Sequence, residues 1–235
     1  MRQAGSVVWP LVLMWAVTGG FGPSRAAGQI SNYALLEGST LTDDCLACDR
    51  VSLPLPLQGT FELLPLNSNP LFTMYQLTNI SFQTTGTIGR AYKVKGEGSD
   101  QVGGEVALQQ DLSLTVQIDD GFTNSLCLFT NAQAQVESPW PEIQAAADQS
   151  NGSFVRLCRL RLTAAPVPQF QSIQAVATNA TIRLEWQSYG GAVQVERAVA
   201  VEGPYAVIAS NVTAQAFEDI GALNNSMRFY YRLRQ

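Results

Sequence analysis

Hydrophobic and polar residues alternate along much of the chain with a period of two, which is typical of half-buried β-strands. The clearest run is LSLTVQI at 112–118, where every second side chain is aliphatic. Asp-Asp-Gly at 119–121 is a turn signal, and residues 125–129 have the composition of a returning strand. The pattern therefore predicts a hairpin here.

Other segments repeat this pattern at spacings typical of a sandwich or a barrel. Phe61 and Leu63 flank one polar residue, and apolar residues alternate with arginines over 158–163. Residues 72–82 are apolar on both parities, which predicts a strand covered on both faces or a bulge near Thr78. The exception is Pro141–Gln149, where an initial proline and three alanines predict a short helix.

These elements predict an all-β fold in two domains. The first, over 28–165, is expected to be a β-sandwich or a barrel-like domain, and it is long enough to bury a core. A proline-containing linker follows at 166–169, and its prolines favour an extended spacer. Residues 170–235 then form a second, smaller β-domain.

The N-terminus predicts a signal peptide over residues 1–27. Arg2 is followed by an apolar run at 7–17, and Ser24-Arg25-Ala26 offers small residues for cleavage. The alternative is a membrane anchor, but the run is too short to span ~30 Å of hydrocarbon. We therefore expect an exported protein whose mature chain has no membrane span.

The charge balance argues against nucleic-acid binding. Loss of Arg2 and Arg25 with the signal changes the net charge from −5 to −7. Binding to nucleic acid needs a basic stripe, and the only arginine cluster, at 156, 159 and 161, alternates as one solvated strand face. The 46% apolar content indicates a globular chain, and uncharged polar residues replace charged ones on its expected surface.

The chain contains no histidine. Nucleophiles activated by histidine and zinc sites built on imidazole are therefore absent from this chain. Carboxylate pairs, cysteine chemistry and oxygen-ligated calcium remain. No residue set identifies a catalytic site, a resident metal or a cofactor.

Four cysteines, Cys45, Cys48, Cys127 and Cys158, allow three disulfide connectivities in an oxidising compartment. The simplest expectation is two structural bridges, Cys45–Cys48 and Cys127–Cys158. A redox role for the CxxC motif is opposed by the acids around it, which raise a thiol pKa. A four-thiolate zinc site would normally have two such motifs.

Carboxylates and one tryptophan are weaker candidates. Asp43, Asp44 and Asp49, or Asp119 and Asp120, could donate oxygens to calcium, but turn chemistry is the favoured explanation of these residues. A glycosidase needs two carboxylates across a cleft, and Glu62, Glu97, Glu105 and Glu142 are available. Trp140, between two prolines, either packs against the helix predicted to follow it or stacks on a sugar ring.

The C-terminal third carries a family resemblance. Five segments in order, IRLEW at 182–186, VQVER at 193–197, GPYAVI at 203–208, FED at 217–219 and FYYRL at 229–233, resemble strands B to F of a fibronectin type III domain. The resemblance implies that Trp186 plugs the core between two sheets. It also implies that Phe229 replaces the family's corner tyrosine, and that the last strand is missing after residue 233, leaving an exposed edge.

The first domain, over 28–165, resembles secreted bacterial proteins without an assigned activity. We therefore expect an exported, non-enzymatic recognition or surface-associated structural protein, since the fibronectin type III fold implies no single activity. The alternative is a small carbohydrate-binding protein or a carboxylate-dependent hydrolase that uses the first domain. The expected partner is a protein or a carbohydrate of unknown identity, not nucleic acid.

Overall fold

The computed structural model describes most of the chain after position 29. The described residues are 30–45, 47–48, 52–85, 90–105, 107–131, 134–136, 138–153, 155–176, 180–189, 191–224 and 227–235. The signal peptide expected over 1–27 and the calcium candidate Asp49 lie outside them. None of the helices within these ranges has the length and apolar character needed to cross a membrane.

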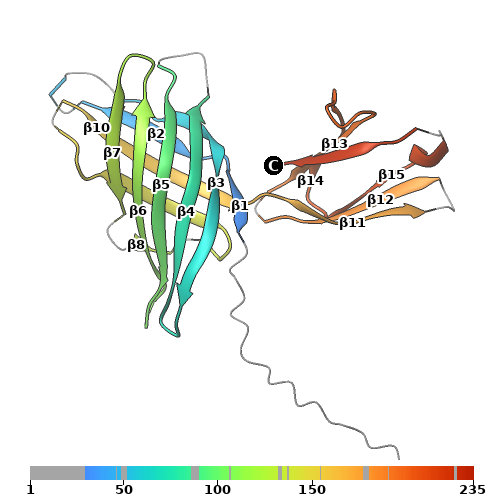
Figure 1. Ribbon diagram of the computed structural model, residues 1–235, viewed down its shortest axis with the longest axis horizontal. Helices are drawn as coiled ribbons and strands as arrows, with labels where there is room; N and C mark the ends of the chain where they lie inside the picture. Colours follow the sequence, from blue (N-terminus) through green and yellow to red (C-terminus); the bar gives the residue numbers. More distant parts are fainter. Residues whose placement is uncertain are drawn as a thin grey trace, which may run out of the picture.

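The structure confirms an all-β fold, arranged in two units (Figure 1). In the described part of the chain, ten strands form the first unit as a single sheet. They are β1 Ser31–Leu35, β2 Thr40–Asp44, β3 Leu55–Ser68, β4 Phe72–Thr84, β5 Lys93–Gly103, β6 Gln109–Asp119, β7 Asn124–Thr130, β8 Ala134–Gln135, β9 Ile143–Gln149 and β10 Leu157–Pro166.

This sheet closes on itself. Successive strands pair antiparallel from β3 to β7 and on to β9, and β10 pairs with both β9 and β2. β1 and β2 lie end to end and share the position between β10 and β3. Of the two predicted forms, the sandwich and the barrel, the strand pairing therefore gives an up-and-down barrel.

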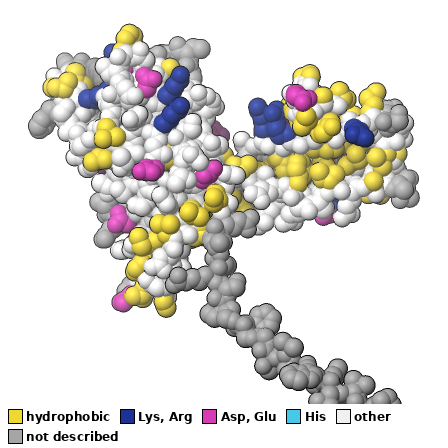
Figure 2. All heavy atoms as spheres, in the orientation of Figure 1, with side chains coloured by type: hydrophobic (Ala, Val, Ile, Leu, Met, Phe, Trp, Pro, Cys, Tyr) yellow, Lys and Arg dark blue, Asp and Glu magenta, His cyan; other side chains and the backbone are white. Residues whose placement is uncertain are grey.

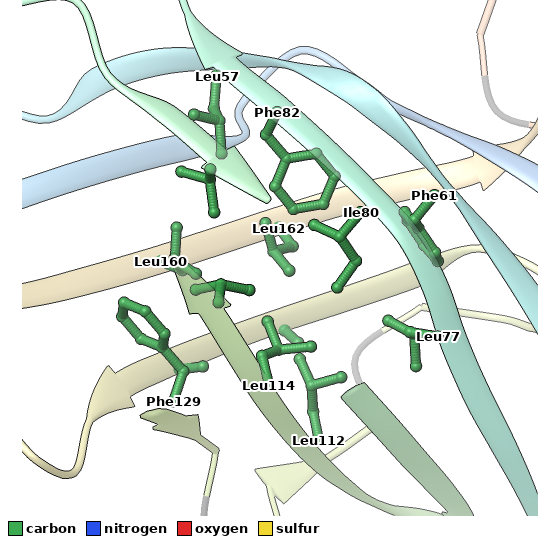
Figure 3. Close-up of a cluster of buried hydrophobic side chains, with 14 of the residues drawn as sticks. Leu57, Phe61, Leu77, Ile80, Phe82, Leu112, Leu114, Phe129, Leu160 and Leu162 are labelled. Atoms are coloured by element: carbon green, nitrogen blue, oxygen red, sulfur yellow. The ribbon is translucent and has the colours of Figure 1, made fainter. Parts of the chain in front are cut away.

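The barrel interior is a packed core. The four aliphatic side chains of β6 predicted to point inward are each at most 1% exposed, while the polar side chains between them face outward. Figure 3 shows the side chains of several strands meeting in this interior. A barrel of about eight strands is just wide enough for side chains to fill it. Binding sites are therefore to be sought at its ends and on its outside.

Two local features bend the barrel wall. The bulge expected near Thr78 is present, because the register of β4 with β5 shifts between Leu77 and Ile80. On β3, Gly59 has a φ of +147°, and an added Cβ would lie 2.1 Å from the Ser81 carbonyl oxygen. Only glycine fits at this position, where β3 approaches β4 closely.

The helix predicted over Pro141–Gln149 is wrong. Residues from Ile143 onward form strand β9, which pairs with β10 and, over two residues, with β7. Ile143, Ala145 and Ala147 are buried and alternate with more exposed side chains. The alanines favour a helix only weakly, and burial of one face against the barrel overrides that propensity.

Two three-stranded sheets, β11–β12–β15 and β14–β13–β16, form the second unit in the described part of the chain. The strands are β11 Gln169–Val176, β12 Thr181–Gln187, β13 Val193–Ala198, β14 Ala206–Val212, β15 Ala216–Asp219 and β16 Tyr230–Arg234, with a short 3-10 helix η2 at Ala222–Asn224. Trp186 is 1% exposed and packs with Leu184, Val193 and Val195. Strands are present at four of the five segments that carry the resemblance, as β12, β13, β15 and β16, and the fifth, at 203–208, overlaps the start of β14. The family assignment itself stays a prediction.

The link between the units is shorter than the predicted 166–169. β10 extends to Pro166 and β11 begins at Gln169, so Val167 and Pro168 alone separate them. The backbone N–H of Val167 also donates to the Asn32 carbonyl oxygen at 2.8 Å. The second unit is thus tied directly to the barrel rather than held off by a spacer. Within the described residues, β16 pairs only with β13, so it forms the predicted edge.

Candidate functional site

A pocket of about 350 Å³ lies where the two units meet. We call it the junction pocket. It is lined by Ile30, Ser31, Tyr33, Trp140, Pro141, Pro166, Val167, Gln169, Gln187 and Tyr189. None of these described lining residues carries a charge. The pocket therefore combines aromatic and proline surfaces with neutral hydroxyl and amide groups.

Trp140 packs on one side and is open on the other. Its ring stacks on Tyr75 of β4, with the ring centroids 4.9 Å apart and an interplanar angle of 23°. Trp140 is nevertheless 50% exposed. The predicted packing on a following helix is therefore wrong, because Trp140 packs on Tyr75 of β4 instead. The part of the ring that stays exposed lines the junction pocket.

The second unit supplies the polar side of the junction pocket. Gln187, at the end of β12, accepts a hydrogen bond from Gln171 Nε2 at 3.4 Å and donates to the Tyr189 hydroxyl. The Gln235 side chain donates to the Tyr189 backbone carbonyl. These contacts hold an amide and a phenol in the same pocket lining as Trp140, whereas the carbohydrate-binding alternative used the first domain.

Tyr33 forms the inner wall of the junction pocket. It is 1% exposed and stacks on Phe61, with centroids 5.2 Å apart. Burial, followed by the nearby Tyr75 and Asp100, raises the pKa of the Tyr33 hydroxyl. The hydroxyl therefore stays neutral and able to donate a hydrogen bond at physiological pH.

A buried carboxyl group lies close to Tyr33. Asp100, near the end of β5, is 1% exposed, and its Oδ2 accepts a hydrogen bond from Gln110 Nε2 at 2.9 Å. Among the described residues, none bonds its Oδ1. Burial raises the pKa of Asp100 to about 6, while the Gln110 bond acts in the opposite direction. We call this region, with the junction pocket, the junction end of the barrel.

The opposite end of the barrel carries an ion-pair network. Arg156 Nε lies 3.5 Å from Asp43 Oδ1, and Arg156 Nη2 lies 3.6 Å from Asp120 Oδ2. Arg90 Nη1 is 3.1 Å from Asp120 Oδ2, and the Tyr92 hydroxyl donates to Asp43 Oδ2 at 2.7 Å. The prediction of one solvated arginine face is therefore wrong for Arg156, because its side chain turns into this network.

The cysteines lie at this second end, which we call the disulfide end. Cys45–Cys48 forms the predicted bridge and lines a pocket of about 330 Å³ together with Arg156. The bridge predicted between Cys127 and Cys158 is not formed, and both residues are buried free thiols. The Cys127 thiol donates to the Ser125 carbonyl oxygen at 3.8 Å, and the Cys158 thiol donates to Asp43 Oδ1 at 3.9 Å.

The aspartates considered for calcium serve in turns or in the network. Asp119 Oδ1 accepts the N–H of Gly121, and Asp120 Oδ1 accepts the N–H groups of Phe122 and Thr123. Asp44 Oδ1 accepts the backbone N–H of Cys45. Among the residues that the structure describes, no three acidic or cysteine side chains gather as metal ligands.

The glutamates considered for hydrolysis do not meet at Trp140. Glu62 accepts hydrogen bonds from Thr78 and Asn79, and Glu142 accepts one from Ser138. Glu97 and Glu105 line separate surface hollows on other strands. Among its described lining residues, the junction pocket therefore has no pair of facing carboxylates of the kind that would indicate a glycosidase.

Comparisons with models of protein families, with curated proteins and with solved structures gave no match for this chain.

The surface agrees with the composition: on the face seen in Figure 2, charged side chains are scattered and most of the barrel surface is neither charged nor hydrophobic.

Proposed function

We propose that this is an exported binding protein that holds a neutral carbohydrate in the junction pocket. The observation that carries the proposal is the half-exposed Trp140 ring, backed by Tyr75 and facing a pocket without charged side chains. The proposal joins the expected recognition role to the carbohydrate-binding alternative.

The chemistry of the lining suits a sugar ring. One face of a pyranose is largely C–H, which packs on an aromatic surface, while its hydroxyls project from the rim toward hydrogen-bonding groups. Trp140 supplies the aromatic surface, and Gln169, Gln187 and Tyr189 supply amide and hydroxyl groups. A few polar groups around an apolar surface are the usual composition of a small-ligand site.

Because none of the described lining residues is charged, we expect a neutral ligand. An anionic ligand would enter this pocket without a cation to balance it, and burying an unpaired charge is costly. Because no carboxylates face each other among the described lining residues, we favour binding over hydrolysis. The disulfide at the far end of the barrel fits an oxidising compartment, which supports the proposal of export.

Trp140→Ala tests the proposal. Mature protein is titrated with a panel of neutral mono- and oligosaccharides, and binding is followed by calorimetry and by tryptophan fluorescence. We expect a member of the panel to bind, and the substitution to weaken that binding about 10–100-fold because the stacking surface is lost.

Phe122→Ala is the matched control. Phe122 is 84% exposed and lies at the disulfide end, so its removal should leave binding unchanged. A panel in which no sugar binds, or equal affinities for wild type and Trp140→Ala, would contradict the proposal.

A further inference from the structure

The second unit has one side on which its two sheets are not linked by a short connection. One sheet has β11 and β15 as its outer strands, and the other has β14 and β16. Residues 213–215 alone connect β14 to β15, and three residues reach little farther than the ~10 Å between packed sheets. β14 and β15 therefore lie on one side of the unit. β11 and β16 lie together on the other side, which we call the open side.

The backbone of β16 forms a free strand edge on the open side. Among the described residues, this strand pairs with β13 and with no other strand. The barrel lies beside one end of it, because Gln235 lines a hollow together with Ala34 and Leu35, but none of the described barrel strands pairs with β16. A row of N–H and C=O groups thus points away from β13, and another strand is the partner that satisfies such a row.

An apolar face is also uncovered on the open side. Ile173 of β11 lies directly opposite Leu184 of β12, and opposed residues share one face of a sheet. Leu184 is 0% exposed in the core, so Ile173 points into the sandwich as well, yet it is 55% exposed. Ala175 is likewise exposed opposite Ile182, which packs against the core. Figure 2 shows hydrophobic side chains gathered along this unit between its two sheets.

Arginines make the edge positive, although the chain has a net charge of −5. Arg232 and Arg234 of β16 alternate with Leu233, which packs against the core, so both arginines face outward. They share Glu196 as their partner, with N–O distances of 2.5 Å and 3.6 Å. One carboxylate balances one of these two charges. Acidic side chains on an added strand would therefore be attracted to this edge.

We propose that the open side binds an extended segment of a partner protein, which adds to β16 as a further strand. The main chain of β16 supplies the hydrogen bonds, and the side chains of the segment alternate between the two faces. The inward ones are aliphatic and cover Ile173, whereas the outward ones are acidic and lie beside Arg232 and Arg234. None of these three residues lines the junction pocket, so this site is independent of the proposed carbohydrate site.

The experiment titrates the mature protein with blocked seven-residue peptides in which valine or isoleucine alternates with glutamate. Binding is followed by calorimetry, and the bound position by hydrogen exchange. We expect one peptide to bind per chain and to slow exchange at residues 230–234, because their outward amides become paired. Lysine in place of glutamate should weaken binding about 10-fold by repulsion, and a central proline should weaken it at least as much, because proline lacks the N–H.

Ile173→Lys tests the apolar face. Lysine at this position cannot be covered by aliphatic side chains, so we expect affinity to fall about 10-fold, while the exposure of the site should leave folding intact. Val207→Lys is the matched control, because Val207 is 52% exposed on β14 at the other side of the unit. Arg234→Glu should reduce the preference for glutamate over lysine in the peptide.

Three results would overturn the proposal. The first is that none of the glutamate peptides binds. The second is that Ile173→Lys and Val207→Lys change the affinity equally, or that exchange slows outside β16. The third is a protein that sediments as a dimer with residues 230–234 already protected, which would assign the open side to a second copy of this chain.

Discussion

The two ends of the barrel bury the same functional group with opposite results. Asp120 at the disulfide end and Asp100 at the junction end are 4% and 1% exposed. The pKa of Asp120 is lowered to about 2, first by the backbone N–H of Thr123, whereas burial raises that of Asp100 to about 6. The supply of donors, and not depth alone, decides whether a buried carboxyl is ionised.

The donors differ because the local chain differs. Asp120 follows β6 in a turn, where consecutive N–H groups point at its carboxylate and Arg90 and Arg156 lie within 3.6 Å. Asp100 lies within β5, where the backbone N–H groups are committed to the ladder with β4 and β6, and Gln110 is the one described residue that donates to its carboxyl group. At the disulfide end, the ionised Asp120 carboxylate is therefore stabilised by its donors. At the junction end, close to the proposed binding site, ionisation of Asp100 lowers the free energy of unfolding.

Arg156→Met should have the largest effect on this contrast. It removes the cation shared by Asp43 and Asp120 while keeping the aliphatic stem, and losing one partner of a largely buried network costs about 3 kcal/mol in the free energy of unfolding. Urea denaturation at neutral pH measures this loss.

Arg159→Met on the same strand is the matched control. Arg159 and its partner Asp148 have side chains that are 55% and 77% exposed, so the cost should stay below about 1 kcal/mol. Equal losses for the two variants would show that the ion pairs of Arg156 at the disulfide end contribute no more to stability than the exposed pair of Arg159.

Sequence patterns predicted the barrel wall better than they predicted its ends. The alternation in β6 identified its inward side chains because burial has the same period as the pleat. It failed at β9, where alanines satisfied a helix pattern as well as a strand pattern. Trp140 was found from composition, since an isolated tryptophan between prolines stands out.

The partners of these residues could not be predicted, because they come from distant strands. Asp43, Asp120 and Arg156 meet only when β2, β6 and β10 reach the same end of the closed sheet. Asp100 was missed because Gly96 and Gly98 share its face of β5, so this strand shows no run of inward apolar residues. The role of Gln187 and Tyr189 depends on how the second unit meets the barrel, which a single sequence does not encode in any local pattern.

Asp100→Asn should remove the destabilisation that the ionised Asp100 carboxylate causes at the junction end. Because the folded-state pKa of about 6 lies above the ordinary value of 3.8, this group favours folding below about pH 4, and that contribution is lost as pH rises through 6. At pH 7.5 the variant should be about 2 kcal/mol more stable than wild type, and the difference should vanish toward pH 4. Thermal unfolding across this range measures both values.

Asp111→Asn is the control for this prediction. Asp111 is exposed and raises the pKa of Asp100 only as a minor cause, after burial, so its removal should change the profile little. Parallel pH profiles for wild type and Asp100→Asn would mean that ionisation of Asp100 does not destabilise the folded protein.

Thr123→Val should give the smallest effect and test why Asp120 differs from Asp100. The Thr123 hydroxyl lies 3.1 Å from both Asp120 oxygens, while the stronger bond from the Thr123 backbone N–H is kept. Because the folded-state pKa of Asp120 is lowered, the stabilisation is present above about pH 4 and is lost as pH falls toward 2. The variant should therefore be about 1 kcal/mol less stable at pH 7 and equal to wild type near pH 2. A loss that persists unchanged at pH 2 would assign the effect of Thr123 to packing and not to its bond with the ionised carboxylate.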